Sequence, residues 1–289
     1  MLTVGLAQAA ELKVVASIKP VHALAAAIMK DVGKPDLIID GPGTPHSYAL
    51  KPSKARLLAK ADLIFWIGPA LETFLQKPVQ TIGVKAQSIE LASVDGLVRR
   101  NIRQIDNIKA TSTDSQIDPH IWLDPQNARV MALNIAKALI NKDPENADKY
   151  QANLQNLLAK LGALTREVLA RLTPVKNQPF ITYHDGYQYF EARFDLKSSG
   201  VLIVDPEIKP GARHIQEINN KLKQSGKICL FSEPQFSQKT LETIAENSQA
   251  KIALLDPLGS NIAPGPGHYL LLIKAMATAF ADCLSSLDE

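Results

Sequence analysis

Short apolar segments rich in β-branched residues alternate with amphipathic segments along most of the chain. The apolar segments predict strands at residues 12–18, 36–39, 62–67, 179–183, 201–204, 227–231 and 251–255. The amphipathic segments predict helices, among them residues 21–32, 52–60, 127–140, 212–223 and 238–247. Strands that alternate with helices form βαβ units, whose parallel sheets are covered by helices on both faces. The pattern therefore predicts an α/β fold.

One long helix interrupts this alternation in the middle of the chain. Asp143 and Pro144 supply a helix-capping residue followed by a proline at the first helical position. Apolar residues then recur every three or four positions until Thr173 and Pro174 end the pattern. A continuous helix of about 29 residues would be about 43 Å long, more than a crossover within one compact sheet requires.

We therefore predict a two-lobed molecule in which residues 143–175 form a rigid linking helix. An N-terminal α/β lobe would comprise residues 11–142, and a C-terminal α/β lobe residues 176–289. The alternative is a long surface helix on a single domain.

Composition and charge narrow the class of protein. Of the 289 residues 46% are hydrophobic, enough for a sizeable core. The formal net charge is only +3 and the charges are dispersed, whereas nucleic-acid-binding proteins concentrate basic residues on one face. We interpret the one short basic cluster, residues 99–103, as a solvated loop and expect no nucleic-acid partner. No apolar run approaches the ~20 residues that a membrane-spanning helix needs.

The N-terminal segment suggests export. Residues 1–10 are uncharged and mildly apolar, and they end in Ala7-Gln8-Ala9, a pattern typical of signal-peptide cleavage. We interpret them as the remnant of a secretory leader; the alternative is an ordinary apolar extension. The two cysteines, Cys229 and Cys283, fit one disulfide in an oxidising compartment, although two free thiols would look identical in the sequence.

Histidines are the residues most suggestive of chemistry, because the sequence has no phosphate-binding loop, dinucleotide fingerprint, nucleophile elbow or H-E-x-x-H motif. His46, His120 and His184 lie in turn-rich segments that follow predicted strands or precede predicted helices. Ligands of open α/β sheets bind beyond the carboxyl ends of the strands, where such residues can converge. Two carboxylates, Glu233 and Asp256, follow strands in the same way.

Three imidazoles and one carboxylate would make a tetrahedral zinc site. Spacing alone does not separate this hypothesis from histidines that are simply hydrogen-bonded in loops. For His22, His214 and His268 nothing local indicates a ligand, so we interpret these three as structural.

Five segments in order resemble one family of proteins. They are PHSYALKPS at 45–53, DPHIWLDP at 118–125, YHDGYQYF at 183–190, FSEPQF at 231–236 and LDPLG at 255–259. Together they resemble the zinc branch of the metal-specific substrate-binding proteins of ABC transporters, the ZnuA-like proteins. The resemblance runs from about residue 12 to the C-terminus.

This resemblance implies a fold, a site and a function. It implies two α/β lobes bridged by one long helix, with a metal in the cleft between them. His46 and His120 would come from the first lobe and His184 from the second. Manganese-binding members have a carboxylate at the position of His184, so the resemblance implies zinc, in keeping with the preference of zinc for imidazole. It also implies a disulfide between Cys229 and Cys283.

The implied function is that of a periplasmic receptor, expected to be a monomer, that captures Zn²⁺ and delivers it to the membrane permease of an ABC importer. Two departures from the family pattern affect the site. Pro45 stands where many members have an acidic residue before the first histidine, so Asp256 becomes the predicted fourth ligand, with water as its alternative and Glu233 in a supporting role. Residues 93–118 contain no histidine, whereas many members have a histidine-rich loop there.

Two other functions are weighed against transport. A zinc hydrolase or hydratase would need an open fourth position on the metal and a nearby general base. Ligation by Asp256 would close that position, so we expect no enzymatic activity. A metal-binding surface adhesin is the other alternative, suggested by some relatives of the manganese-binding members, and no feature of this sequence supports it.

Overall fold

The computed structural model describes residues 11–41, 43–104, 117–204, 206, 211–236, 238–246 and 248–288. The predicted leader remnant, residues 1–10, lies outside this part of the chain, as do residues 105–116 of the polar loop. Among the described residues, none of the helices combines the length and the apolar character that crossing a bilayer requires.

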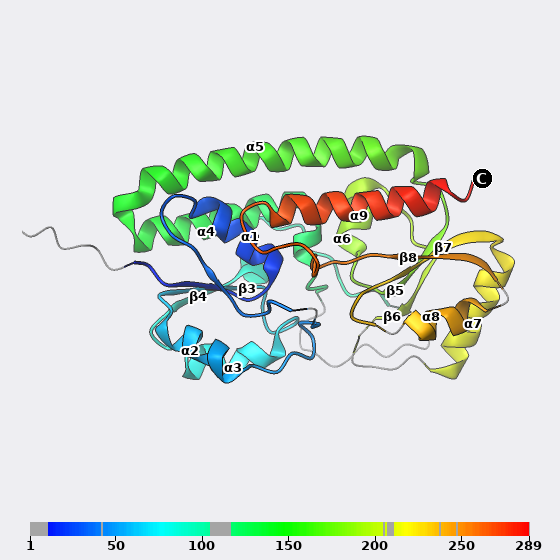
Figure 1. Cartoon of the computed structure of the whole chain (residues 1–289), viewed down its shortest axis with the longest axis horizontal. Coiled ribbons are helices and arrows are strands. Elements are labelled where there is room, and N and C mark those ends of the chain that lie inside the picture. Colours follow the sequence, from blue (N-terminus) through cyan, green and yellow to red (C-terminus); the bar gives the residue numbers. More distant parts are fainter. Residues whose placement is uncertain are drawn as a thin grey trace, which may run out of the picture.

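Two parallel four-stranded sheets form the two halves of the molecule (Figure 1). The first has the order β2-β1-β3-β4 and contains β1 (Val14–Ala16), β2 (Asp36–Leu37), β3 (Leu63–Trp66) and β4 (Gln87–Glu90). The second has the order β6-β5-β7-β8 and contains β5 (Phe180–His184), β6 (Gly200–Ile203), β7 (Lys227–Ser232) and β8 (Gln249–Leu254). The predicted α/β fold is confirmed. In each sheet the first strand lies between the next two strands, an arrangement that opens a crevice at its carboxyl end.

Helices cover both sheets. They are α1 (Lys19–Ile28), α2 (Pro52–Lys60), α3 (Thr73–Thr81), α4 (Pro125–Lys142), α5 (Ala147–Leu172), α6 (Gln188–Phe194), α7 (Ala212–Gln224), α8 (Gln238–Ala245) and α9 (His268–Ser285). Short 3₁₀ turns lie at Leu91–Ser93, Ile121–Leu123, Pro144–Asn146 and Thr173–Val175. In Figure 1, α2 and α3 lie on one side of the first sheet, and α7 and α8 lie on the same side of the second.

The predicted linking helix is α5, which runs along both halves of the molecule with α9 beside it (Figure 1). The continuous α-helix has 26 residues and is shorter than predicted, because Pro144–Asn146 forms a separate 3₁₀ turn. The residue that precedes α5 is Asn146 and not Asp143, and the Asp143 side chain caps no backbone N–H. Its carboxylate instead accepts hydrogen bonds from the side-chain amide of Asn146 and the hydroxyl of Tyr150.

The remaining differences from the sequence prediction concern short elements. Strand β4 was not predicted, because Gln87–Glu90 is polar, half exposed and at the edge of its sheet. The strands predicted at 12–18 and 36–39 are shorter in the structure, since only residues 14–16 and 36–37 pair with neighbouring strands.

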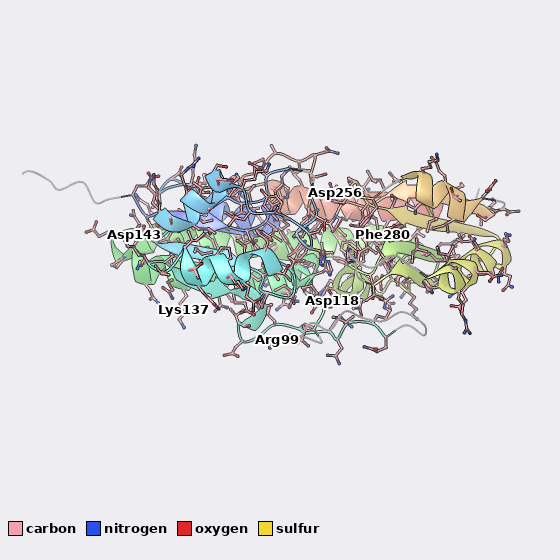
Figure 2. All side chains as sticks on the ribbon, turned by 90° about the horizontal axis from the view of Figure 1, so that it is seen from below. Arg99, Asp118, Lys137, Asp143, Asp256 and Phe280 are labelled. Carbon is pink, nitrogen blue, oxygen red and sulfur yellow. A yellow bond between two sulfur atoms is a disulfide. The ribbon has the colours of Figure 1, made fainter. Side chains whose placement is uncertain are left out.

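One apolar core runs through both halves. It joins residues of α1 and α4 in the first half to residues of β5 and β7 in the second through the helices α5 and α9. Phe280 of α9, labelled in Figure 2, is a centre of this core, because its ring contacts those of Phe180, Phe190 and Phe231 at centroid distances of 5.3, 5.4 and 4.7 Å. A second, smaller cluster lies between the second sheet and helices α7 and α8.

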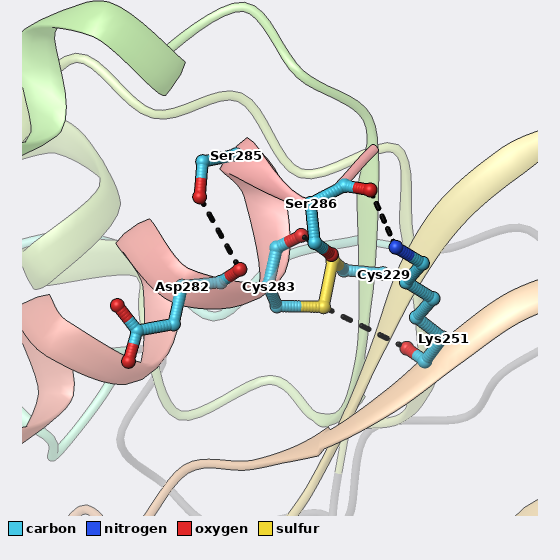
Figure 3. Close-up of a disulfide and its surroundings, with 6 residues drawn as sticks. All are labelled: Cys229, Lys251, Asp282, Cys283, Ser285 and Ser286. Atoms are coloured by element: carbon cyan, nitrogen blue, oxygen red, sulfur yellow. Dashed lines mark hydrogen bonds between the residues drawn. A yellow bond between two sulfur atoms is a disulfide. The ribbon is translucent and has the colours of Figure 1, made fainter. Parts of the chain in front are cut away.

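A disulfide joins Cys229 of β7 to Cys283 of α9, as the family resemblance implied (Figure 3). Lys251 of β8 lies beside the bond. Its carbonyl oxygen is 3.8 Å from the Cys283 sulfur, and its ammonium donates a hydrogen bond to the carbonyl of Ser286. The disulfide therefore fixes the end of the last helix to the second sheet.

Glu72 is fully buried at the carboxyl end of β3. Its Oε2 accepts the backbone N–H groups of Ile67 and Gly68 at 2.8 and 3.0 Å. Burial raises the pKa of this carboxyl from an ordinary 4.5 to about 7, although these hydrogen bonds oppose the shift. The folded protein therefore retains, between these two pH values, a proton that the unfolded chain has lost.

We expect Glu72→Gln to change how stability depends on pH. In the wild type the free energy of unfolding should fall as pH rises from about 4.5 to 7, because the folded state binds the additional proton. Glutamine keeps an acceptor for the two N–H groups and carries no charge. The variant should be more stable than the wild type at pH 8 by about 1–3 kcal/mol, and this advantage should vanish at pH 5. Urea unfolding of both proteins at pH 5 and pH 8 checks this prediction. The same difference in the free energy of unfolding at both pH values would contradict it.

Candidate metal centre

The structure brings together the three histidines that the sequence singled out. His46 lies in the loop between β2 and α2, His120 immediately precedes the turn Ile121–Leu123, and His184 is the last residue of β5. One ring nitrogen from each lies within 4.8 Å of the others. His120 and His184 are almost fully buried and His46 is half-buried. The described residues contain no other group of three or more potential metal ligands packed this closely.

The spacing of the nitrogens suits a small tetrahedral cation. Nε2 of His46 and Nε2 of His120 are 3.3 Å apart. Two nitrogens bound at about 2.0–2.1 Å to a tetrahedral zinc also lie about 3.3 Å apart. The two rings therefore stand at the separation that a shared zinc ion requires.

Asp118 orients the imidazole of His120. Its Oδ1 lies 2.7 Å from Nδ1 of His120 and also accepts the backbone N–H of the same residue at 3.0 Å. A buried carboxylate holds the proton on the nitrogen that it faces, so the lone pair is left on Nε2. A carboxylate behind a histidine is the usual support of a metal ligand, because it fixes the ring and raises its basicity.

Glu233 supports His184 in the same way. Its Oε1 lies 3.3 Å from Nδ1 of His184, and Nε2 of His184 is buried without a hydrogen-bond partner among the described residues. Gly186 makes room for the two rings: a Cβ at this position would lie 3.2 Å from the His184 ring and 3.3 Å from the His120 ring. A larger residue would push apart the two imidazoles.

Burial and neighbouring charges act in opposite directions on the histidines. Burial lowers the pKa of His46 well below its ordinary value, and proximity to His120 and His184 lowers it further. Burial is also the largest influence on His184 and lowers its pKa, but Glu233 and the more distant Asp185 and Asp118 together outweigh burial and raise it. His46 is therefore held neutral, as a metal ligand must be, whereas at His184 protons compete with the metal.

The structure does not bring Asp256 to the three histidines. Its Oδ1 accepts the backbone N–H of Leu258, and its Oδ2 accepts both the backbone N–H and the hydroxyl of Ser260. The carboxylate thus caps its own turn. In Figure 2 Asp256 and Asp118 both lie near the middle of the long axis but apart from each other. The prediction that Asp256 is the fourth ligand gains no support from this arrangement.

A small pocket surrounds the three imidazoles. It is lined by Thr44, Pro45, His46, His120, Trp122, His184, Glu233, Gln235, Pro257 and Leu258. The side chain of Pro45 offers no ligand to it. The pocket therefore combines three imidazoles with mostly apolar walls, to which Glu233 and Gln235 add buried polar atoms that have no hydrogen-bond partner among the described residues.

On one side of the site, ionic contacts join α6 to the first half of the chain. Arg103 lies 2.7 Å from a carboxylate oxygen of Glu191 and 3.5 Å from one of Asp185. Arg193 of α6 forms a two-pronged ion pair with Asp124, at 2.6 and 2.7 Å. Sequence reasoning assigned Arg103 to a solvated loop, and this was wrong: its side chain is largely buried against partners more than 80 positions away, which no local pattern indicates.

Comparisons with known proteins agree with this geometry. A sequence model of the family described as zinc-uptake complex component A, periplasmic (ZnuA), matches residues 14–283. The high-affinity zinc uptake system protein ZnuA of Brucella suis is 42% identical, over 94% of this chain and 91% of that protein. The protein of the same name from Yersinia pestis is 32% identical over the same shares.

Solved structures have the same fold. A crystal structure of ZnuA superimposes with a TM-score of 0.81 at 27% identity, covering 95% of this chain and all of the other. The laminin-binding protein of Streptococcus agalactiae, described as a bifunctional protein with adhesin and metal transporting activity, gives a TM-score of 0.78 at 26% identity. It covers 94% of this chain and 99% of its own.

Proposed function

The chain belongs to the periplasmic zinc-uptake complex component A family, and from this premise we propose that His46, His120 and His184 hold the zinc ion that it captures. The protein is the substrate-binding receptor of an ABC zinc importer, with zinc as its transported ligand and the membrane permease as its partner. The observation that carries the ligand assignment is the convergence of one ring nitrogen from each of the three histidines. Carboxylates also hold the rings of His120 and His184 through Nδ1.

We propose that water takes the fourth zinc position. One oxygen of Asp118 faces Nδ1 of His120 and one of Glu233 faces Nδ1 of His184, and the carboxylate of Asp256 caps its own turn. Zinc accepts three protein ligands and one water in many proteins. The buried carboxylates offset the charge of the ion without coordinating it.

The family membership decides against the enzyme alternative, because members are substrate-binding receptors. A location in the periplasm follows from the same membership. We further propose that residues 1–10 are the remnant of the leader that directs export, and that the receptor acts as a monomer without a nucleic-acid partner. The proposed lobes are residues 11–142 and 176–289, joined by residues 143–175.

A zinc titration of chelator-stripped protein against a competing chromophoric chelator tests this function. We expect one tight equivalent of zinc per chain. Weak binding, or several equivalents of similar affinity, would show that the three histidines do not form one receptor site.

We expect Asp118→Asn to weaken zinc binding by about tenfold to a hundredfold, because the loss of a carboxylate behind a metal-binding histidine typically costs this much. Asparagine keeps an acceptor for His120 but lowers the basicity of the ring. Asp143→Asn is the control, since Asp143 accepts two hydrogen bonds at the far end of the first half (Figure 2). Equal affinities for both variants in the chelator competition would exclude the supporting role of Asp118.

A further inference from the structure

The segment between β8 and α9 forms one wall of the zinc pocket. We call residues 257–262 the wall loop; its first two residues, Pro257 and Leu258, line the pocket. The carbonyl of Pro257 accepts the indole N–H of Trp122 at 2.8 Å, and that of Leu258 lies 2.9 Å from Nε2 of His268. Both donors are almost fully buried.

Lys19 holds the remainder of the wall loop. Its ammonium lies 2.6 Å from the carbonyl oxygen of Ser260, 3.0 Å from that of Ile262 and 3.5 Å from that of Gly259. The side chain is only 5% exposed, and within the described part of the chain no carboxylate pairs with it. An ammonium has three donors and no acceptor, so three carbonyl oxygens satisfy it without a counter-charge.

This contact joins the two halves of the molecule. Lys19 is the first residue of α1 and directly follows β1 in the first sheet, whereas the wall loop follows β8 of the second. None of the Lys19 contacts involves His46, His120 or His184, so they do not depend on the metal. The wall of the pocket is therefore fixed from outside the ligand set.

We propose that Lys19 is a positioning residue for zinc, which fixes the wall loop against the first half of the chain and thereby slows the loss of the ion. The inference rests on the proposed zinc-receptor function. Because the wall loop is already ordered before zinc binds, less conformational entropy is lost on binding. The loop also keeps solvent away from the bonds between zinc and the histidine nitrogens. Loosening it should act mainly on the dissociation rate.

The test is the rate at which zinc passes from the loaded protein to an excess of chelator in stopped flow. Lys19→Met keeps the aliphatic stem and removes the ammonium, and we expect zinc to dissociate about tenfold faster. Lys251→Met is the matched control. Lys251 also donates to a backbone carbonyl, that of Ser286, but entirely within the second half and beside the disulfide. Its rate should stay within twofold of the wild type.

A second measurement separates positioning from general loss of stability. In a Trp66→Phe background Trp122 is the sole indole, and its N–H bonds the wall loop. Lys19→Met should shift the emission of the chelator-treated protein to longer wavelength and increase acrylamide quenching, whereas Lys251→Met should do neither. The proposal would be overturned if zinc left the Lys19→Met protein at a rate within twofold of the wild type. It would also be overturned if Lys19→Met and the control variant accelerated the loss of zinc equally.

Gly259→Ala disturbs the same loop while residue 19 remains lysine. Gly259 has φ +62°, and an added Cβ would lie 2.9 Å from the His268 ring. If Lys19→Met does not fold, this variant must show the faster zinc loss, and a wild-type rate in it would refute the proposal. A wild-type protein that binds no zinc would instead refute the receptor function itself.

Discussion

Replacing His120 with alanine should weaken zinc binding by more than about a hundredfold. Removal of a carboxylate behind a metal-binding histidine already costs tenfold to a hundredfold, and loss of the ligand itself must cost more. His120 is also the ring that stands 3.3 Å from His46, at the spacing a shared zinc requires. The competition titration that counts zinc equivalents measures this directly.

His214→Ala is the matched control for this prediction. Its imidazole is also buried and bonds one backbone carbonyl, that of Val201, but it lies on α7 away from the other histidines. Its loss should change the affinity for zinc less than threefold. Comparable losses in the two variants would mean that zinc binding depends on general stability and not on His120 as a ligand.

Reducing the disulfide between Cys229 and Cys283 should lower the free energy of unfolding by about 4 kcal/mol. The bond closes a loop of 54 positions, and the chain-entropy account of disulfides gives about this value for such a loop. For a chain of this size that corresponds to a fall in Tm of roughly 7 °C. Thermal unfolding with and without a phosphine reductant checks the prediction on an unchanged sequence.

The double variant Cys229→Ala/Cys283→Ala serves as control, because the reductant has no bond to break in it and its Tm should not respond. Both sulfurs are in the disulfide and neither carries a thiol, so alkylation of the unfolded, unreduced protein should label neither. Labelling of the unreduced protein, or a Tm in the wild type that is indifferent to reductant, would contradict the assignment.

The approximate places of His46, His120 and His184 could be predicted from the sequence, because strand ends and turn residues mark the edge of a parallel sheet where ligands bind. Their convergence could not be derived from spacing; the family resemblance supplied it. Asp256 satisfied the same strand-end criterion, but its carboxylate caps its own turn in the structure. The sequence after it, Pro-Leu-Gly-Ser, is typical of such a turn.

Contacts between distant parts of the chain account for what the sequence did not reveal. The partners of Lys19 lie some 240 positions away, and those of Arg103 more than 80. Neither residue differs locally from an ordinary surface cation. The polar strand β4 was missed for another reason: its pairing with β3, and not its own residues, makes it a strand.

The position of α9 has a consequence for the order in which the molecule is completed. This last helix packs on α1 and α5, and Tyr269 of α9 donates a hydrogen bond to the carbonyl of Trp122. The first half of the protein therefore lacks part of its covering until the final residues of the chain are available. Contacts between the two ends of a chain form slowly, because a long segment must be ordered before they are made. We therefore expect a fragment that ends before α9 to leave the apolar faces of α1 and α5 partly uncovered.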